Sequence, residues 1–137
     1  MSQENVEIIR RVYEAWKAGD EETIFSTYDP GIRLNPDREA SWVGMDEDYL
    51  GHRGMRRYMS AVYEAFDDYR PEVEQIIDAG EGRVLVLAIE HGRGRGSGAE
   101  VQSAKTAHLW TLHDAKAVQL DLFLDRERAL EAVGLSA

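Results

Sequence analysis

The chain has 137 residues, of which 43% are hydrophobic and 31% are charged, and it carries a formal net charge of −10. This length predicts one domain with its own core, and the acidic surplus argues against nucleic-acid binding, because a phosphate backbone is held by surplus Lys and Arg. The absence of cysteine excludes disulfides and thiolate metal ligands.

The N-terminal stretch MSQENVEIIRRVYEAW starts with polar residues and carries charges throughout, unlike a secretory signal peptide. No apolar tract is long enough to cross a bilayer. We therefore expect a single domain over residues 1–137 with a cytoplasmic location and no membrane partner.

The first part of the chain predicts two helices and a strand. Residues 4–18 place four apolar side chains at helical spacing, namely Val6, Ile9, Tyr13 and Trp16. Gly19 is expected to end this helix, and Asp20 to cap a second short helix over residues 21–28. A short strand is expected at residues 32–35.

A polar segment and a third helix follow. Residues 36–51 are acidic and rich in turn formers, so we interpret them as a long loop. In the stretch YLGHRGMRRYM, Gly51 and Gly54 allow the backbone to turn, and His52 is interpreted as a clasp for the loop. The third helix is expected to pack Met55, Tyr58, Met59, Val62 and Phe66 inward and to end at Pro71.

Three arginines lie near the start of that helix: Arg53, Arg56 and Arg57. Cations are slightly unfavourable at the positive end of a helix. The acidic run Asp46–Asp48 lies just upstream, and we expect it to offset them.

The second half changes to the composition and alternation of strands. Four strands are expected, over residues 72–79, 83–91, 101–112 and 117–124. Short links make successive strands antiparallel neighbours. A last helix over residues 126–133 is expected between Asp125, its N-cap, and Gly134. Helices followed by an antiparallel meander predict an α+β fold.

The strand over residues 83–91 is apolar on both faces. Leu85, Leu87 and Ile89 alternate with Val84, Val86 and Ala88. One face is expected to meet the helices. The other is then available to a second subunit, so we expect a homodimer through the sheet face.

Several ordered motifs resemble the SnoaL-like branch of the nuclear-transport-factor-2-like superfamily. They are an N-terminal helix ending in AGD, a helix start GHRG, the four-strand meander, and the close DRERALEAVGL. The resemblance implies a cone, in which a curved antiparallel sheet wraps around the N-terminal helices and leaves an internal pocket. The superfamily includes ketosteroid isomerase, polyketide cyclases, limonene epoxide hydrolase and pocketed proteins of no known activity, so the fold alone does not assign a function.

The resemblance to ketosteroid isomerases allows their catalytic positions to be compared. Asn35, in RLNP, matches their general-base aspartate, but an amide orients a substrate and cannot take a proton. His108 matches their second, protonated aspartate. Val12 matches their oxyanion tyrosine, with Tyr13 one position on and turned about 100° away. Steroid isomerisation is therefore not expected.

The resemblance to polyketide cyclases is closer in the last strands. Those enzymes keep acid/base residues on the inward positions of the final strand. The corresponding positions here are Leu120, Leu122 and Leu124, which are chemically inert. This strand therefore gives no support to cyclase chemistry.

His108 is the candidate general base, and Asp121 is its candidate partner. A two- or four-residue loop between the last two strands pairs His108 with Asp121, with Cβ atoms about 5 Å apart. A carboxylate there raises the pKa of an imidazole and fixes its tautomer. A three-residue loop pairs His108 with Leu122 instead, and the family alignment favours this second register. His108 then has the alternative role of a core or pocket histidine.

Four aromatic side chains are candidate ligand-binding residues beside Asn35: Tyr13, Trp16, Tyr28 and Trp110. Tyr28 falls where the resemblance to isomerases implies a pocket tyrosine. The alternative for each of the four is a place in the core, with a satisfied hydroxyl or indole N–H. No metal site is expected, because the four histidines lack ligand spacing.

The sequence thus favours a protein that holds a small organic ligand in its pocket. If it is an enzyme, the reaction is proton transfer, cyclisation or hydration/dehydration, of the isomerase, cyclase or lyase type. Such reactions need a positioned base and a desolvated cavity, and no cofactor. The alternatives are a non-catalytic ligand-binding module and a protein-interaction module.

Overall fold

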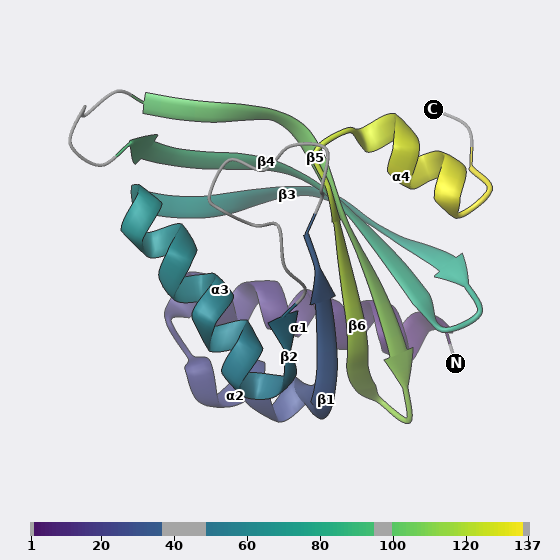
Figure 1. Cartoon of the computed structure of the whole chain (residues 1–137). Coiled ribbons are helices and arrows are strands. Elements are labelled where there is room, and N and C mark those ends of the chain that lie inside the picture. Colours follow the sequence, from purple (N-terminus) through teal and green to yellow (C-terminus); the bar gives the residue numbers. More distant parts are fainter. Residues whose placement is uncertain (1, 37–48, 95–99, 136–137) are drawn as a thin grey trace.

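The computed structural model describes residues 2–36, 49–94 and 100–135 (Figure 1). Its elements in chain order are α1 (Ser2–Ala18), α2 (Glu21–Thr27), β1 (Tyr28–Asn35), β2 (Tyr49–Leu50), α3 (Gly51–Ala65), β3 (Phe66–Gly80), β4 (Arg83–Gly94), β5 (Glu100–His113), β6 (Lys116–Phe123) and α4 (Arg126–Ala132). Figure 1 shows α1, α2 and α3 on one side of a curved sheet and α4 on the other. The predicted α+β class is confirmed.

The helix ends follow their predicted capping residues. Gly19 ends α1 with a positive φ of 72°, a conformation that glycine adopts without strain. The side chain of Asp20 accepts a hydrogen bond from the backbone N–H of Thr23, at 3.1 Å, and so caps α2. Asp125 caps α4 in the same way through the N–H of Glu127. None of the helices in the described residues is long and apolar enough to cross a membrane.

The strand order is β2-β1-β6-β5-β4-β3. The sheet is mixed rather than purely antiparallel, because β1 runs parallel to β6 while the other neighbours are antiparallel. The predicted end of the third helix was wrong: α3 ends at Ala65, and Pro71 lies inside β3. Since β3 is an edge strand, the missing N–H of Pro71 need not break the ladder.

The register of β5 and β6 depends on a bulge. Asp114 and Ala115 form a two-residue turn, both with positive φ, and His113 pairs with Lys116. Between Leu112 and Thr111 the register shifts by one residue, because Val118 is an extra residue on β6. Leu122 therefore lies opposite His108.

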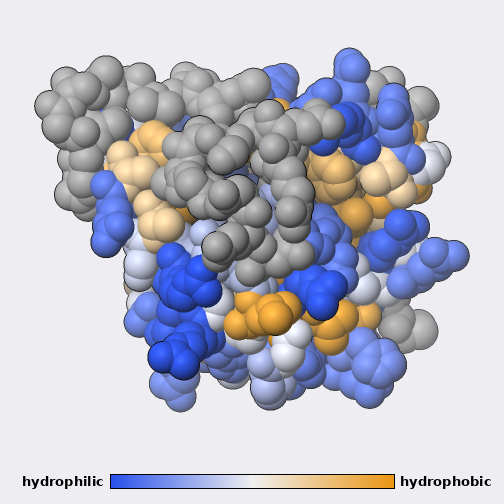
Figure 2. Space-filling view, viewed as in Figure 1, coloured by the Kyte–Doolittle hydropathy of each residue, from blue (hydrophilic) through white to orange (hydrophobic). Residues whose placement is uncertain are grey.

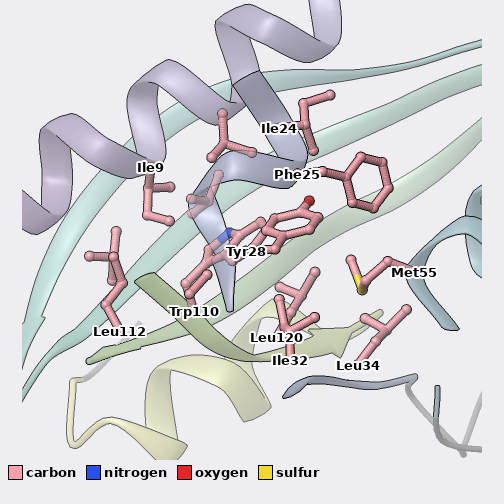
Figure 3. Close-up of a cluster of buried hydrophobic side chains, with 14 of the residues drawn as sticks. Ile9, Ile24, Phe25, Tyr28, Ile32, Leu34, Met55, Trp110, Leu112 and Leu120 are labelled. Atoms are coloured by element: carbon pink, nitrogen blue, oxygen red, sulfur yellow. The ribbon is translucent and has the colours of Figure 1, made fainter. Parts of the chain in front are cut away.

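The main core fills the space between the sheet and helices α1 to α3. Figure 3 shows side chains from the helices meeting those of β1, β5 and β6. Among the most buried are Ile9, Ile24, Ile32, Leu34 and Met55. The inward face of β4 supplies Val84, Val86 and Ala88, as its alternation predicts.

A second, smaller core lies on the opposite face of the sheet. There α4 packs Ala129 and Leu130 against Leu85, Leu87 and Leu109. Two of the apolar residues that suggested a subunit interface, Leu85 and Leu87, are therefore covered by the chain itself, whereas Ile89 is partly exposed. The homodimer remains a prediction.

The surface in Figure 2 is mostly hydrophilic, with small hydrophobic patches. Within the described residues, the well-exposed large apolar side chains are Leu50, Tyr63 and Leu135. No described surface thus carries a large group of exposed apolar side chains.

The stretch YLGHRGMRRYM forms the start of α3 as expected. His52 Nε2 lies 2.9 Å from the carbonyl oxygen of Tyr28 and so holds α3 to β1, which agrees with its interpretation as a clasp. Arg56 lies over the ring of Phe25, 4.0 Å from its centroid, and Arg57 over that of Tyr49. Cation–π contacts of this kind offset the unfavourable position of a helix N-terminus. The expected partner, Asp46–Asp48, lies outside the described residues.

Gly54→Ala is expected to destabilise the protein by about 1–3 kcal/mol. A Cβ at Gly54 would lie 2.8 Å from the backbone carbonyl carbon of Tyr49, closer than two such atoms approach. This overlap outweighs the gain in helix propensity of about 1 kcal/mol. Urea unfolding measures the loss, with Ser60→Ala, an exposed position on the same helix, as the control. Equal effects at both positions would contradict the close approach.

Candidate functional site

A small cavity, which we name the inner cavity, lies between the helices and the concave face of the sheet. Its volume is about 40 Å³, which is room for about three water molecules. It is lined by His108 and by all four aromatic residues predicted to bind a ligand: Tyr13, Trp16, Tyr28 and Trp110. Tyr58 and Tyr69 also line it, so its walls are largely aromatic.

His108 is paired with a carboxylate, and the carboxylate is Glu90 on β4. His108 Nε2 lies 2.7 Å from Glu90 Oε1, and each residue is only 8% exposed. In the ladder His108 is opposite Val86, so the two side chains meet diagonally across the curved inner face. Ala88, which lies between them on that face, leaves room because its side chain is one methyl group.

Glu90 accepts hydrogen bonds from three side chains. His108 is one donor, the Tyr69 hydroxyl is the second at 2.5 Å, and the Thr106 hydroxyl is the third at 3.3 Å. Burial by itself would raise the pKa of Glu90, but these hydrogen bonds and the charge of His108 outweigh it, so the pKa lies below the ordinary value. Glu90 is therefore ionised at neutral pH.

The other ring nitrogen of His108 faces Tyr13 on α1. The Tyr13 hydroxyl oxygen lies 2.6 Å from Nδ1 of His108, and the indole Nε1–H of Trp110 donates to the same oxygen at 3.0 Å. The Tyr13 and His108 rings are stacked, with centroids 5.9 Å apart. Burial raises the pKa of Tyr13 well above its ordinary value. Tyr13 is thus a neutral phenol at rest.

This geometry is compatible with both protonation states of His108. A neutral imidazole donates from Nε2–H to Glu90 and accepts the Tyr13 proton at Nδ1. An imidazolium donates from both nitrogens, and the Tyr13 hydroxyl proton is then free to turn toward the cavity. The hydrogen bonds among Tyr13, His108 and Glu90 can thus form in either protonation state of His108, which suits the three groups to moving a proton.

The remaining tyrosines of the cavity are also held neutral. Burial raises the pKa of Tyr28, although a hydrogen bond with Trp16 acts to lower it. Burial also raises the pKa of Tyr58. Tyr28 also stacks on Trp110, with ring centroids 5.8 Å apart. These residues are suited to shaping the cavity rather than to carrying charge.

Two predicted site residues lie elsewhere. The register places Asp121 opposite Leu109, on the sheet face that carries α4. There Asp121 accepts hydrogen bonds from Asn35 Nδ2 at 2.6 Å and from Gln119 Nε2 at 2.9 Å. The structure therefore does not form the His108–Asp121 pair, and Asn35 does not line the cavity. The bulge at Val118 is the physical reason for the first difference.

Sequence reasoning missed Glu90 and Tyr69. Glu90 had a readable signal: it continues the inward series of Val84, Val86 and Ala88 at alternate positions. A carboxylate on a buried face needs hydrogen-bond donors, and Thr106 and His108 lie inward on the next strand. Tyr69 gave no such signal, because Pro71 argued against a strand at that place.

The other histidines have different partners. His91 Nε2 lies 2.9 Å from Glu72 on the sheet edge, and His113 lies beside Asp114 in the exposed turn. Among the residues that the structure describes, no three His, Asp or Glu side chains are grouped so as to hold a metal ion. His108 is the histidine that lines the inner cavity.

Comparison with known proteins agrees with this geometry at the level of the fold. The family model described as the SnoaL-like domain matches residues 9–120. The search of curated proteins found no match.

Three solved structures illustrate the likeness. TerC, co-crystallised with polyporic acid, is 22% identical, with a TM-score of 0.77 over 95% of this chain and 98% of its own. An NTF2-like protein of unknown function from Burkholderia pseudomallei is 20% identical, with a TM-score of 0.78 over 96% and 98%. A candidate SnoaL-like polyketide cyclase from Jannaschia sp. CCS1 is 21% identical, with a TM-score of 0.74 over 98% and 94%. At these identities the likeness concerns the fold alone.

Proposed function

Because the chain belongs to the SnoaL-like domain family, we propose that it binds a small organic molecule between its helices and its sheet. We further propose that the hydrogen-bonded chain Tyr13–His108–Glu90 moves a proton to or from that molecule. The observation that carries this proposal is the pairing of His108 with a buried carboxylate on one side and with the hydroxyl of a cavity-lining tyrosine on the other.

The proton transfer runs through three groups. The bound molecule gives a proton to the Tyr13 oxygen while Tyr13 gives its own hydroxyl proton to Nδ1 of His108. The bound molecule is left as an anion, and the imidazolium is stabilised by the ionised Glu90 through Nε2–H. Tyr13 passes the proton on and is not itself a phenolate in the resting protein, because its pKa is raised.

An aromatic or enolic compound fits this site best. The walls are mainly aromatic rings, which favour a flat partner. TerC, a relative in fold, was co-crystallised with polyporic acid, which supports testing hydroxyquinones first. Removal of a proton from a carbon next to a carbonyl group requires no cofactor, because a positioned base in a cavity shielded from bulk water is sufficient.

A non-catalytic binding module is the second candidate. It is favoured by Leu120 and Leu122, which line the cavity at positions where the cyclases were expected to carry acid/base residues. In that case the Glu90–His108 pair fixes the shape of the cavity and does no chemistry.

The proposal predicts proton exchange that depends on His108. Compounds are first selected by thermal shift from hydroxyquinones, polyketide-like phenols and small ketones. For a compound that binds, deuterium uptake at the carbon next to the carbonyl is followed by NMR in D₂O. His108→Gln is expected to slow it by about 100-fold, which is the usual contribution of a general base.

His113→Gln is the matched control, because His113 lies in the exposed turn beside Asp114. It is expected to leave the exchange rate unchanged. A compound that binds and exchanges equally fast with His108→Gln contradicts the proton-transfer role and favours the binding module. Wild-type protein that binds none of these compounds contradicts both.

A homodimer through the sheet face and a cytoplasmic location accompany the proposal as expectations. The apolar face is partly covered by α4, so the interface would use the remaining outer surface of the sheet. Light scattering after size exclusion gives the mass of the particle. A monomer at micromolar concentration contradicts the dimer.

A further inference from the structure

The inner cavity is too small for the molecules that the site is suited to. Its volume of about 40 Å³ is far below the roughly 300–1,000 Å³ of ordinary ligand pockets. A second and larger hollow adjoins it, a groove between α1 and β3 with a volume of about 730 Å³. We name it the outer groove; Arg10 and Lys17 on α1 and Arg70 and Val73 on β3 are among its lining residues.

Four residues line both the cavity and the outer groove and so form the wall between them: Tyr13, Trp16, Tyr69 and Pro71. Tyr13 is held by hydrogen bonds with His108 and Trp110. Trp16 has a hydrogen bond with Tyr28. Tyr13 and Trp16 are both on helix α1. Pro71 is restrained by its ring.

Tyr69 is the member of this wall that lies at a bulge of the edge strand, and one side-chain hydrogen bond, from its hydroxyl to Glu90, anchors it. Its ring meets Trp16 and Tyr63 at their edges, with centroids 6.4 and 6.5 Å away. It lies on the edge strand β3, where the pairing with β4 shifts by one residue between Asp67 and Arg70. A bulge on an edge strand re-aims a side chain and leaves the backbone with a neighbour on one side only.

We propose that the outer groove is the entrance to the inner cavity, and that a ligand passes between them by moving the Tyr69 ring. This inference rests on the proposed ligand site. The ligand is a flat aromatic molecule with an ionisable hydroxyl, whose ring takes the place of Tyr69 and whose hydroxyl reaches Tyr13.

The charges of the outer groove agree with this ligand class. Its lining includes three cations, Arg10, Lys17 and Arg70, and two acids, Glu14 and Glu72. Arg10 is paired with Glu7, and Glu72 with His91. In a chain with a net charge of −10, this is a local excess of positive charge. It favours a molecule that carries partial or full negative charge.

Movement of the Tyr69 ring also changes the hydrogen bonding of the Glu90–His108 pair, in which His108 is the proposed base. Tyr69 donates one of the three side-chain hydrogen bonds that Glu90 accepts. When the ring leaves, Glu90 loses that donor, and its carboxylate attracts the Nε2–H of His108 more strongly. Tyr69 is thus a positioning residue, which links the arrival of a ligand to the strength of the Glu90–His108 pair.

The test uses exchange of the Trp110 indole N–H with deuterium, observed by NMR in the ligand-free protein. This N–H donates to Tyr13 at the back of the cavity. Tyr69→Ala is expected to speed its exchange at least ten-fold, because water gains access from the outer groove. Leu50→Ala, which shortens an exposed apolar side chain that lines neither the cavity nor the groove, is expected to leave it unchanged.

General loss of stability is separated from opening of the wall by the backbone amide of Val86, a buried residue of the same core. Global opening accelerates exchange at the Val86 amide and at the Trp110 indole N–H by the same factor. Removal of the wall accelerates exchange at the Trp110 indole alone. Equal acceleration at both, or no acceleration at Trp110, overturns the proposal.

Tyr69→Phe separates the hydrogen bond from the wall. It is expected to keep the slow exchange of Trp110 and to shift the ring ¹⁵N signals of His108. Adding 2-naphthol to wild-type protein is expected to shift His108 in the same direction. Absence of that shift, or a shift in the opposite direction, contradicts the coupling. Failure of the proton-transfer role would appear in the His108→Gln exchange rates and would leave the Trp110 result unaffected.

Discussion

Replacing Glu90 with alanine is expected to lower the free energy of unfolding by about 3–5 kcal/mol, the usual loss when one partner of a buried pair is removed. Glu90 is 8% exposed and accepts hydrogen bonds from His108, Tyr69 and Thr106. Its removal leaves these donors without their shared acceptor in a place that water hardly reaches. Urea unfolding followed by circular dichroism measures the loss.

A second His–Glu pair in the same sheet provides the control. His91 Nε2 lies 2.9 Å from Glu72 Oε1, but the Glu72 side chain is 61% exposed. Glu72→Ala is expected to cost less than about 1 kcal/mol, because exposed pairs contribute little. If the two alanine variants lose the same stability, burial does not govern the difference, and the central role of Glu90 is wrong.

The contribution of Glu90 also depends on pH. Its pKa in the folded protein lies below the ordinary value of 4.5. Ionised Glu90 therefore stabilises the folded state above that value, and this stability is lost as the pH falls through the folded pKa. The difference between wild type and Glu90→Gln is expected to be full at pH 7 and to decrease below about pH 4.5. A difference that grows in acid contradicts the ionised form.

A double replacement tests whether the pair itself is needed for folding. Glu90→Leu leaves His108 facing an apolar partner, whereas Glu90→Leu with His108→Leu removes both polar groups. Replacement of a buried pair by apolar side chains is often neutral. The double variant is thus expected to be more stable than Glu90→Leu alone, which would assign the pair to function rather than to stability.

The local rules of sequence reading were sufficient for most of the fold. Periodicity placed α1 and the four strands of the meander, and short polar side chains placed the caps at Asp20 and Asp125. These features depend on residues close in sequence. The parallel pairing of β1 with β6 is a long-range contact, and no local pattern specifies it.

The site shows where one residue decides the outcome. The two-residue turn at Asp114 and Ala115 on its own leads to a register in which Asp121 faces His108. The extra residue Val118 turns the rest of β6 by one position, so that Leu122 faces His108 and Asp121 joins the opposite face. A bulge has no clear sequence signature, so the sequence could not show whether Asp121 or Leu122 faces His108.

The candidate residues were thus identified more reliably than their partners. Tyr13, His108 and Trp110 were each selected as cavity residues, and they line the cavity together. Their connection through the Tyr13 oxygen requires the distance between α1 and β5, which a sequence does not contain. Glu90 was available from strand alternation, which shows that a charged residue in an inward series is worth testing first.

Trp110→Ala is expected to lower the free energy of unfolding by about 3–5 kcal/mol, as large-to-small replacements of buried aromatic residues do. Trp110 is 3% exposed, stacks on Tyr28 and meets Tyr13 at its edge. Its loss removes these contacts and the donor to Tyr13. Because Trp110 lines the inner cavity, the new space is continuous with it.

A small aromatic ligand can test whether this enlarged cavity is open. Indole has the shape of the missing side chain and is expected to raise the melting temperature of Trp110→Ala, since a ligand that binds only the folded state stabilises it. Trp110→Phe keeps one ring there but loses the N–H donor and part of the ring volume, so it is expected to cost less than Trp110→Ala and to gain less from indole. Equal effects of indole on wild type and both variants would mean that it binds elsewhere. Stabilisation confined to Trp110→Ala would show that the inner cavity can grow to hold an aromatic molecule, as the proposed ligand requires.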